Sequence, residues 1–285
     1  MKEKFNIYQE ITDRIIEKLE QGEIPWKKPW VGGAQSGAFN RISKKPYSLL
    51  NQLLLQHDGE YATYKQWESL GGQVRKGEHA EIVVFWKPTQ ITETDEDGEK
   101  LTKTVPILRY FSVFHISQVD GVAPLASKEK TFDHQPIDEA EKIKCEYMSR
   151  EHLRIIETSS DRAFYSPSQD YIQIPGKEQY EDINEFYSTL FHEMVHSTGH
   201  ASRLNRFENK AKAAAFGSAE YSKEELIAEI GAASLINMVG IETANTFNNS
   251  VAYVQGWLKV LRNDNKFIVD ASSRAEKAVK YILGV

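Results

Sequence analysis

At 285 residues, the chain is long enough for two domains of ordinary size. Its 40% hydrophobic and 27% charged residues are typical of a folded protein, and no apolar run approaches the roughly 18–20 residues of a membrane-spanning helix. The net charge of −6 argues against a general nucleic-acid-binding protein, and a single cysteine excludes an internal disulfide. The charged, amphipathic N-terminus does not resemble a signal peptide, so we expect a cytoplasmic protein with no membrane contact.

The first half of the chain is predicted to mix helices and strands. Apolar residues at helical spacing predict a helix from Phe5 to Gly22, and shorter helices are expected over 48–56 and 64–70. A β-branched and aromatic run predicts a strand over 82–86, and a returning strand over 105–116 follows a charged hairpin tip at 93–100. A segment rich in charged and small residues, about 120–135, is expected to link the two halves.

The first half is also locally basic. Residues 24–91 carry nine Lys/Arg against five Asp/Glu, a balance of +4, whereas residues 126–285 carry 19 against 24, a balance of −5. Within 24–30, two prolines exclude a regular helix and leave two tryptophans beside two lysines. Single-stranded nucleic acid is held by aromatic rings that stack on bases and by cations that follow the phosphates. Both kinds of side chain are interleaved here.

These side chains form a candidate surface for single-stranded DNA. Its members are Trp26, Lys27, Lys28, Trp30, Arg41, Lys44, Lys45, Tyr47, Arg75, Lys76, Trp86 and Lys87. The alternative is that the rings belong to a hydrophobic core and the charges to an ordinary solvated surface.

The second half is predicted to begin with strands and to continue with helices. A helix over 137–151 precedes a strand over 153–157 and a strand, turn and strand over 163–175. Helices around 192 and 225, then over 244–262 and 273–283, complete the chain. This is the order that a zincin requires. We therefore expect an α+β protein with a first domain over 1–125 and a second over 126–285.

The strongest motif is HExxH. His192 and His196 lie four residues apart on a predicted helix, so their imidazoles share one face and can bind one Zn²⁺ together. Glu193 lies one position along and can serve as the general base that activates a water. Gly199 is expected to end the helix as a left-handed cap. The alternative is an amphipathic helix with two surface histidines and an acidic neighbour.

A catalytic zinc usually has three protein ligands. The extended metzincin pattern requires a histidine at position 202, which is Ser202 here, and His200 lies beyond the expected end of the helix. The better candidate is Glu225, on a downstream helix that is rich in small residues and could approach closely. Glu229 lies one turn later, where gluzincins place an acid that holds a zinc histidine from behind.

Three alternatives to this ligand assignment stay open. Glu220 and Glu224 are the other candidate ligands, and the carboxylates at 225 and 229 could instead form a solvated helix face. If the site cuts peptide bonds, we expect the strand Tyr171–Ile174 to pair with an extended protein substrate.

Several ordered stretches of this sequence resemble the ArdC-type antirestriction proteins of conjugative plasmids and mobile elements. They are Ile24–Trp26, Tyr47–Asn51, Gly71–Glu78, Val83–Lys87, Tyr165–Asp170, His192–His200, Ser202–Arg206 and Glu224–Glu229, together with Asn40. One departure is His115, where the family pattern leads us to expect an asparagine.

The resemblance implies an N-terminal single-stranded-DNA-binding domain, a C-terminal zincin-like metallopeptidase domain and a role in protecting incoming DNA from host restriction. Two rival hypotheses remain. In the first, the protein only covers DNA and its metal site is structural. In the second, it is a metalloprotease whose first half recognises protein.

Overall fold

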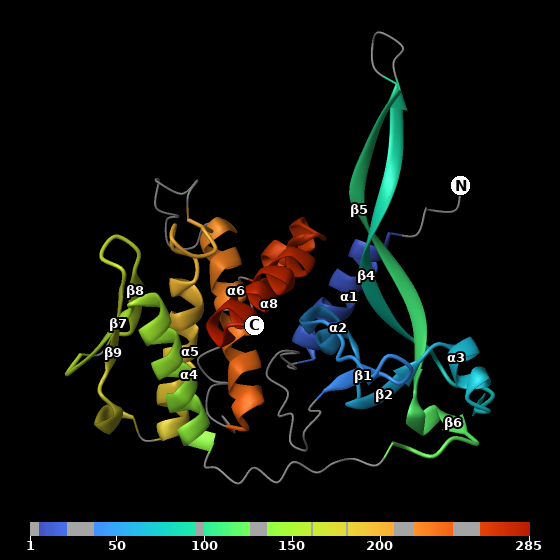
Figure 1. Ribbon diagram of the computed structural model, residues 1–285, viewed down its shortest axis with the longest axis horizontal. Helices are drawn as coiled ribbons and strands as arrows, with labels where there is room; N and C mark the ends of the chain where they lie inside the picture. Colours follow the sequence, from blue (N-terminus) through green and yellow to red (C-terminus); the bar gives the residue numbers. More distant parts are fainter. Residues whose placement is uncertain are drawn as a thin grey trace.

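The computed structural model describes residues 6–21, 37–94, 100–125, 136–160, 162–180, 182–207, 219–241 and 257–285. It is an α+β protein in which a first half built on a long β-ribbon lies beside a second, mainly helical half (Figure 1). Within the described residues, no helix combines the length and apolar character needed to cross a membrane.

The first half is organised around the antiparallel ribbon of β4 and β5. The ribbon continues into a four-stranded sheet of order β1-β2-β5-β4, in which β1 runs parallel to β2. Helices α1 and α2 lie between this sheet and the second half (Figure 1). The elements are α1 (Ile7–Glu20), β1 (Ala38–Asn40), α2 (Leu49–Leu54), β2 (Gly59–Ala62), β4 (Glu81–Thr94) and β5 (Lys100–His115).

A small subdomain closes the lower end of the ribbon. Helix α3 (Tyr64–Ser69) packs beside β3 (Gln73–Val74), which pairs with β6 (Val119–Asp120) after the 3₁₀ turn η2 (Ile116–Gln118). Trp67 is fully buried here and donates its indole N–H to the carbonyl of Phe114 at 2.9 Å. Its ring therefore serves the core and not the surface.

The second half places one three-stranded sheet against a layer of helices. Its strands are ordered β7-β9-β8, with β7 parallel and β8 antiparallel to β9. The elements are α4 (Pro136–Glu151), β7 (Arg154–Thr158), β8 (Phe164–Ser166), β9 (Tyr171–Pro175), η3 (Lys177–Gln179), α5 (Ile183–Ser197), α6 (Ala219–Val239) and α8 (Phe267–Leu283).

This order corrects the expected role of Tyr171–Ile174. Strand β9 is paired on both sides, so its backbone N–H and C=O groups are already satisfied and it has no edge to offer a peptide. Among the described strands of this sheet, only β7 and β8 have an outer edge.

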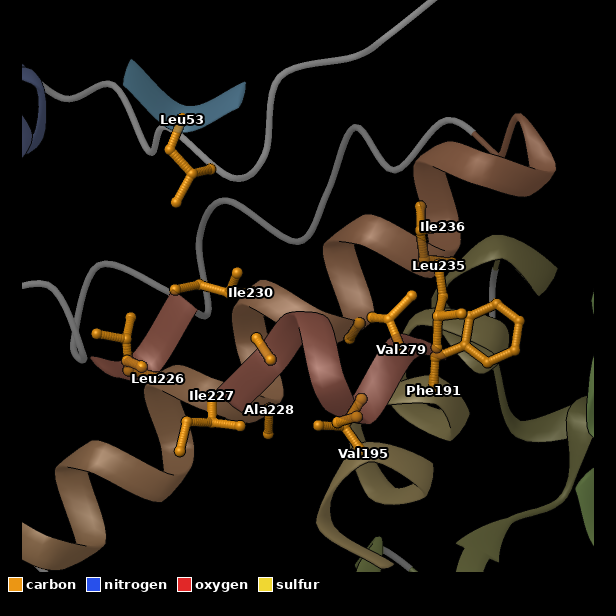
Figure 2. Close-up of a cluster of buried hydrophobic side chains, with 14 of the residues drawn as sticks. Leu53, Phe191, Val195, Leu226, Ile227, Ala228, Ile230, Leu235, Ile236 and Val279 are labelled. Atoms are coloured by element: carbon orange, nitrogen blue, oxygen red, sulfur yellow. The ribbon is translucent and has the colours of Figure 1, made fainter. Parts of the chain in front are cut away.

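One hydrophobic core runs through both halves. Helix α6 is buried along most of its length, because it lies between α5, α8 and α4. Figure 2 shows Leu53 of α2 reaching toward this cluster, to which Ile230 of α6 and Val279 of α8 belong. Leu53 is only 2% exposed although it belongs to the first half. The two halves are therefore held together by burial of apolar side chains, as each half is on its own.

Most predicted elements exist, with different bounds. Strand β4 ends eight residues beyond its predicted end at 86, β5 begins five residues before its predicted start at 105, and α8 begins at Phe267, six residues before the expected start. The predicted helix over 244–262 lies mainly outside the described residues, which are helical from 257 to 263. The strands β1, β2, β3 and β6 were not expected, because each has only two to four residues and carries no periodic signal.

Candidate functional site

Helix α5 carries both histidines of the HExxH motif. Asp182 caps its first turn by accepting a hydrogen bond from the backbone N–H of Asn184 at 2.9 Å. Its apolar residues Phe186, Leu190 and Met194 are fully buried, which fixes the rotation of the helix. His192 and His196 then lie one turn apart, with their Nε2 atoms separated by 3.1 Å.

Helix α6 brings a carboxylate to the same point. Oxygens of Glu225 lie 3.6 Å from His192 Nε2 and 3.5 Å from His196 Nε2. The close approach depends on Gly231, where a Cβ would lie 2.8 Å from a methyl carbon of Val195 on α5. A larger residue at 231 would push the helices apart and move the carboxylate away from the histidines.

These three side chains fit a divalent metal. His192, His196 and Glu225 each offer one ligand atom, and these atoms all lie within 4.8 Å of one another. A tetrahedral zinc with bonds of about 2.1 Å spaces its ligand atoms about 3.4 Å apart, which is close to the separations in this group. The side chains are 13–18% exposed, so a water or a substrate oxygen can approach from outside.

Two further carboxylates lie behind the histidines. Glu229 lies 3.7 Å from Nδ1 of His192. Glu224 is 3.4 Å from Nδ1 of His196. In each imidazole, Nδ1 therefore faces a carboxylate, and Nε2 faces the other residues of the group, where it can bind a metal.

The carboxylates dominate the electrostatics of the site. Burial lowers the pKa of His192, but Glu225, Glu229 and Glu193 outweigh it and raise that pKa to about 9. Burial raises the pKa of Glu224, but His196 and Arg206 outweigh it and lower that pKa to about 2. Glu193 is itself buried, at 8% exposure, directly after the first histidine. This concentration of negative charge attracts a cation.

The expected left-handed cap at Gly199 is wrong. Helix α5 ends at Ser197 with Thr198 as its C-cap, and Gly199 does not have a positive φ. The glycine is needed for a different reason. A Cβ there would lie 2.5 Å from the ring of Phe207, which packs against it when the chain turns back after the helix.

Sequence reasoning missed the arginine that supports Glu224. Arg206 contacts both oxygens of this carboxylate, at 2.7 and 3.1 Å. Glu224 was a fallback ligand in the sequence, but in the structure it lies behind His196 and outside the ligand group. No local pattern of charge indicates the pair, because the two residues are far apart in the sequence. The side chain of Glu220, the other fallback ligand, lies outside the described residues.

Several of the candidate DNA-binding residues are engaged within the protein itself. Arg41 pairs with Glu60, and Arg75 pairs with Glu78 at 2.8 Å and Asp120 at 3.3 Å. Tyr47 is buried and packs edge-on to Tyr61, which removes it from the candidate stacking surface. The remaining candidates outside the described residues are Trp26, Lys27, Lys28 and Trp30.

Trp86 and Lys87 leave the ribbon on opposite sides, because successive strand residues alternate. Trp86 is 48% exposed and lies 6.5 Å from the ring of Tyr8 on α1. Exposed lysines also remain at Lys44, Lys45 and Lys76.

The structure adds two exposed aromatic residues on the Lys87 side of the ribbon. Phe85 and Phe111 are 44% and 49% exposed, and their ring centroids are 6.0 Å apart. Arg109 lies directly opposite Phe85 in the register, so it shares this face. Phe85 lay within the predicted strand, but its exposure depends on what covers the ribbon and could not be predicted from spacing.

Two family models match the chain. The N-terminal domain of anti-restriction factor ArdC matches residues 5–114, and a zincin-like metallopeptidase matches residues 144–274. The metal-free crystal structure of antirestriction protein ArdC from plasmid R388 has 33% identity and a TM-score of 0.76, covering 98% of this chain and 97% of that one. The chain belongs to the ArdC antirestriction family. The Mn(II)-bound structure of the same relative has a TM-score of 0.75, 32% identity and 98% coverage of each chain.

Two curated relatives extend the family. DNA primase TraC of Escherichia coli is 35% identical over an alignment of 297 positions, gaps included, which covers 97% of this chain but 27% of TraC. This chain therefore spans about a quarter of the length of that relative. The uncharacterised protein y4eC of Sinorhizobium fredii is 32% identical over an alignment of 293 positions, gaps included, which covers 97% of this chain and 91% of that protein.

Proposed function

We propose that this protein binds single-stranded DNA through its first half, holds one Zn²⁺ in a metallopeptidase-type site in its second half, and protects incoming DNA from restriction. The observation that carries the proposal is the convergence of His192, His196 and Glu225. Membership of the ArdC family supports the antirestriction role, and the Mn(II)-bound relative supports a divalent metal.

The residues of this chain suit peptide hydrolysis. When bound, zinc supplies a Lewis acid that polarises a carbonyl and acidifies a water. Glu193 is the general base: it takes a proton from the attacking water and returns it to the leaving amine. Glu193 is buried beside the histidines, so bulk water does not compete for its proton. A substrate peptide would align along β8, the edge strand that packs against α5.

The ribbon supports the DNA-binding part of the proposal. Phe85 and Phe111 offer rings on which bases can stack, and Lys87 and Arg109 follow on the same face to meet phosphates. Neither cation has a salt bridge to any residue in the described ranges. The charge of this face is thus available to a nucleic acid.

The test uses Glu193→Gln in the full chain. This variant keeps the metal ligands and the volume of the side chain, so zinc content and affinity for labelled single strands are expected to match the unaltered protein. Zinc-dependent cleavage of a peptide library should disappear. Protection of transferred DNA from restriction is measured in parallel.

If the variant loses cleavage but protects DNA fully, the peptidase site is not part of antirestriction and the DNA-covering hypothesis is favoured. If single strands do not bind to the unaltered protein, the first half recognises something else, and the hypothesis of a protease with a protein-binding domain replaces ours.

A further inference from the structure

Arg206 lies in the segment that follows α5 and turns back onto the end of that helix. Its Nε and Nη2 donate to the two oxygens of Glu224, at 3.1 and 2.7 Å. The same guanidinium donates to the hydroxyl of Thr198 at 2.6 Å and to the carbonyl of Val195 at 2.8 Å. The side chain is 4% exposed, so water does not compete for these contacts. Four donations therefore hold the guanidinium in one orientation.

Glu224 connects Arg206 to His196 of the metal site. The oxygen that Arg206 Nη2 holds, Oε1, is the one that lies 3.4 Å from Nδ1 of His196. A carboxylate in that place accepts the Nδ1 proton, so the lone pair of the imidazole is left on Nε2. Nε2 is the atom that faces Glu225 and His192.

The two histidines are supported unequally. Glu229 stands behind His192 at 3.7 Å, and no Lys or Arg in the described residues pairs with it. Glu224 stands behind His196 and is held by a buried arginine. Within the described residues, only the carboxylate behind His196 is held by an arginine, which contacts both of its oxygens. The orientation of His196 is therefore fixed before a metal binds.

Arg203 provides a comparison within the same segment. It is 1% exposed, contacts both oxygens of Asp170 at 2.8 and 2.9 Å, and donates to the carbonyl of Ser197 at 3.0 Å. It thus repeats the contacts of Arg206 with a carboxylate and with the end of α5. Asp170, however, accepts from the hydroxyl of Tyr165 and contacts neither histidine of the helix.

We propose that Arg206 is a positioning residue: acting through Glu224, it fixes the tautomer and orientation of His196 and so sets the metal affinity of the site. The inference rests on the proposed zinc site. A purely structural arginine would stabilise the fold without changing how tightly the folded protein binds metal.

The experiment measures zinc affinity by competition with a chelator and thermal unfolding of the metal-free protein, both on the full chain. Arg206→Gln is expected to bind zinc about 10–100-fold more weakly, the usual effect of losing an outer partner of a ligand. Arg203→Gln, the matched control, should lower the melting temperature and leave the zinc affinity of the folded protein unchanged. Arg206→Lys should fall between, because an ammonium cannot hold both oxygens.

A double-variant cycle decides whether Arg206 acts through Glu224. In a Glu224→Gln background, Arg206→Gln should cause little further loss of zinc affinity. If Arg206→Gln does not fold, the comparison of Arg206→Lys with Glu224→Gln carries the same test.

Three results separate the possible failures. Zinc affinity equal to that of the unaltered protein in Arg206→Gln or in Arg206→Lys overturns the inference and leaves the zinc site standing. Equal losses in Arg203→Gln and Arg206→Gln reduce Arg206 to a structural role. No zinc binding by the unaltered protein overturns the proposed function itself.

Discussion

The metal centre and the ribbon face differ in how their side chains are held. At the metal centre, each imidazole has a carboxylate behind it and Glu225 in front of it, on two helices that a glycine lets approach. On the ribbon face, Phe85 and Phe111 touch one another, and Lys87 and Arg109 have no ion pair within the described part of the chain.

The difference is the one expected from the ligands that we propose for the two regions. A small cation requires its ligand atoms within fractions of an ångström, so the side chains must be fixed before it binds. A single strand of DNA is long and flexible, and it adapts to any surface that offers stacking and positive charge. The side chains of the metal centre are therefore held in place, whereas those of the ribbon face are exposed.

Removal of the third ligand should have the largest effect. Glu225→Ala is expected to weaken zinc binding by more than about 100-fold, because even outer partners contribute 10–100-fold. Elemental analysis after dialysis measures the retained metal. Full retention in this variant, together with loss in Glu220→Ala or Glu224→Ala, would move the ligand to another glutamate.

The shared core should make the two regions unfold together. Leu53→Ala, in the first half, removes a buried side chain that belongs to the cluster of α6 and α8, and should cost about 2–5 kcal/mol. Calorimetry should show one transition that moves to lower temperature. Ile42→Ala, an exposed control at 47%, should change stability by less than about 0.5 kcal/mol. Two resolved transitions, with only one shifted, would mean that the halves are independent.

Loss of a stacking ring should weaken DNA binding without affecting the metal site. Phe111→Ala is expected to cost about 1–3 kcal/mol in affinity for a labelled single strand, with little change in salt dependence. Tyr64→Ala is the control, since Tyr64 is 45% exposed on α3, away from the ribbon pair. Trp26 lies outside the described residues. Measuring both the DNA affinity and the melting temperature of Trp26→Ala tests whether this ring binds DNA or belongs to the core. Equal losses for Phe111 and Tyr64 would contradict a localised platform.

The residues of the proposed metal site could be identified in the sequence because their spacing on each helix is local. Two histidines four residues apart on a helix must share a face, and two glutamates at the same spacing must share another. The partner of Glu224 could not be predicted in this way, because Arg206 meets it only through a turn of the chain. The surface proposed for DNA depends even more on tertiary structure: Arg41 is a cation of the kind that contacts phosphates, but it is paired with Glu60.

The smallest effect should separate free cations from paired ones. Each phosphate contact to a single strand contributes about 0.7 to the slope of log K against log salt. Arg109→Gln and Lys87→Gln should each reduce the slope by about that amount, because both charges lie on the same face of the ribbon as Phe85 and Phe111. Arg75→Gln should leave the slope unchanged, because the Arg75 guanidinium is held by Glu78, Asp120 and the carbonyl of Ser117.

Fluorescence anisotropy titrations at several salt concentrations give these slopes, and duplex DNA of the same length is the reference. Duplex should bind more weakly, because paired bases cannot reach Phe85 and Phe111. A reduced slope for Arg75→Gln alone would place the phosphates beside η2 and not along the ribbon. An affinity for duplex equal to that for single strands would contradict stacking altogether, and the exposed rings would then need another explanation.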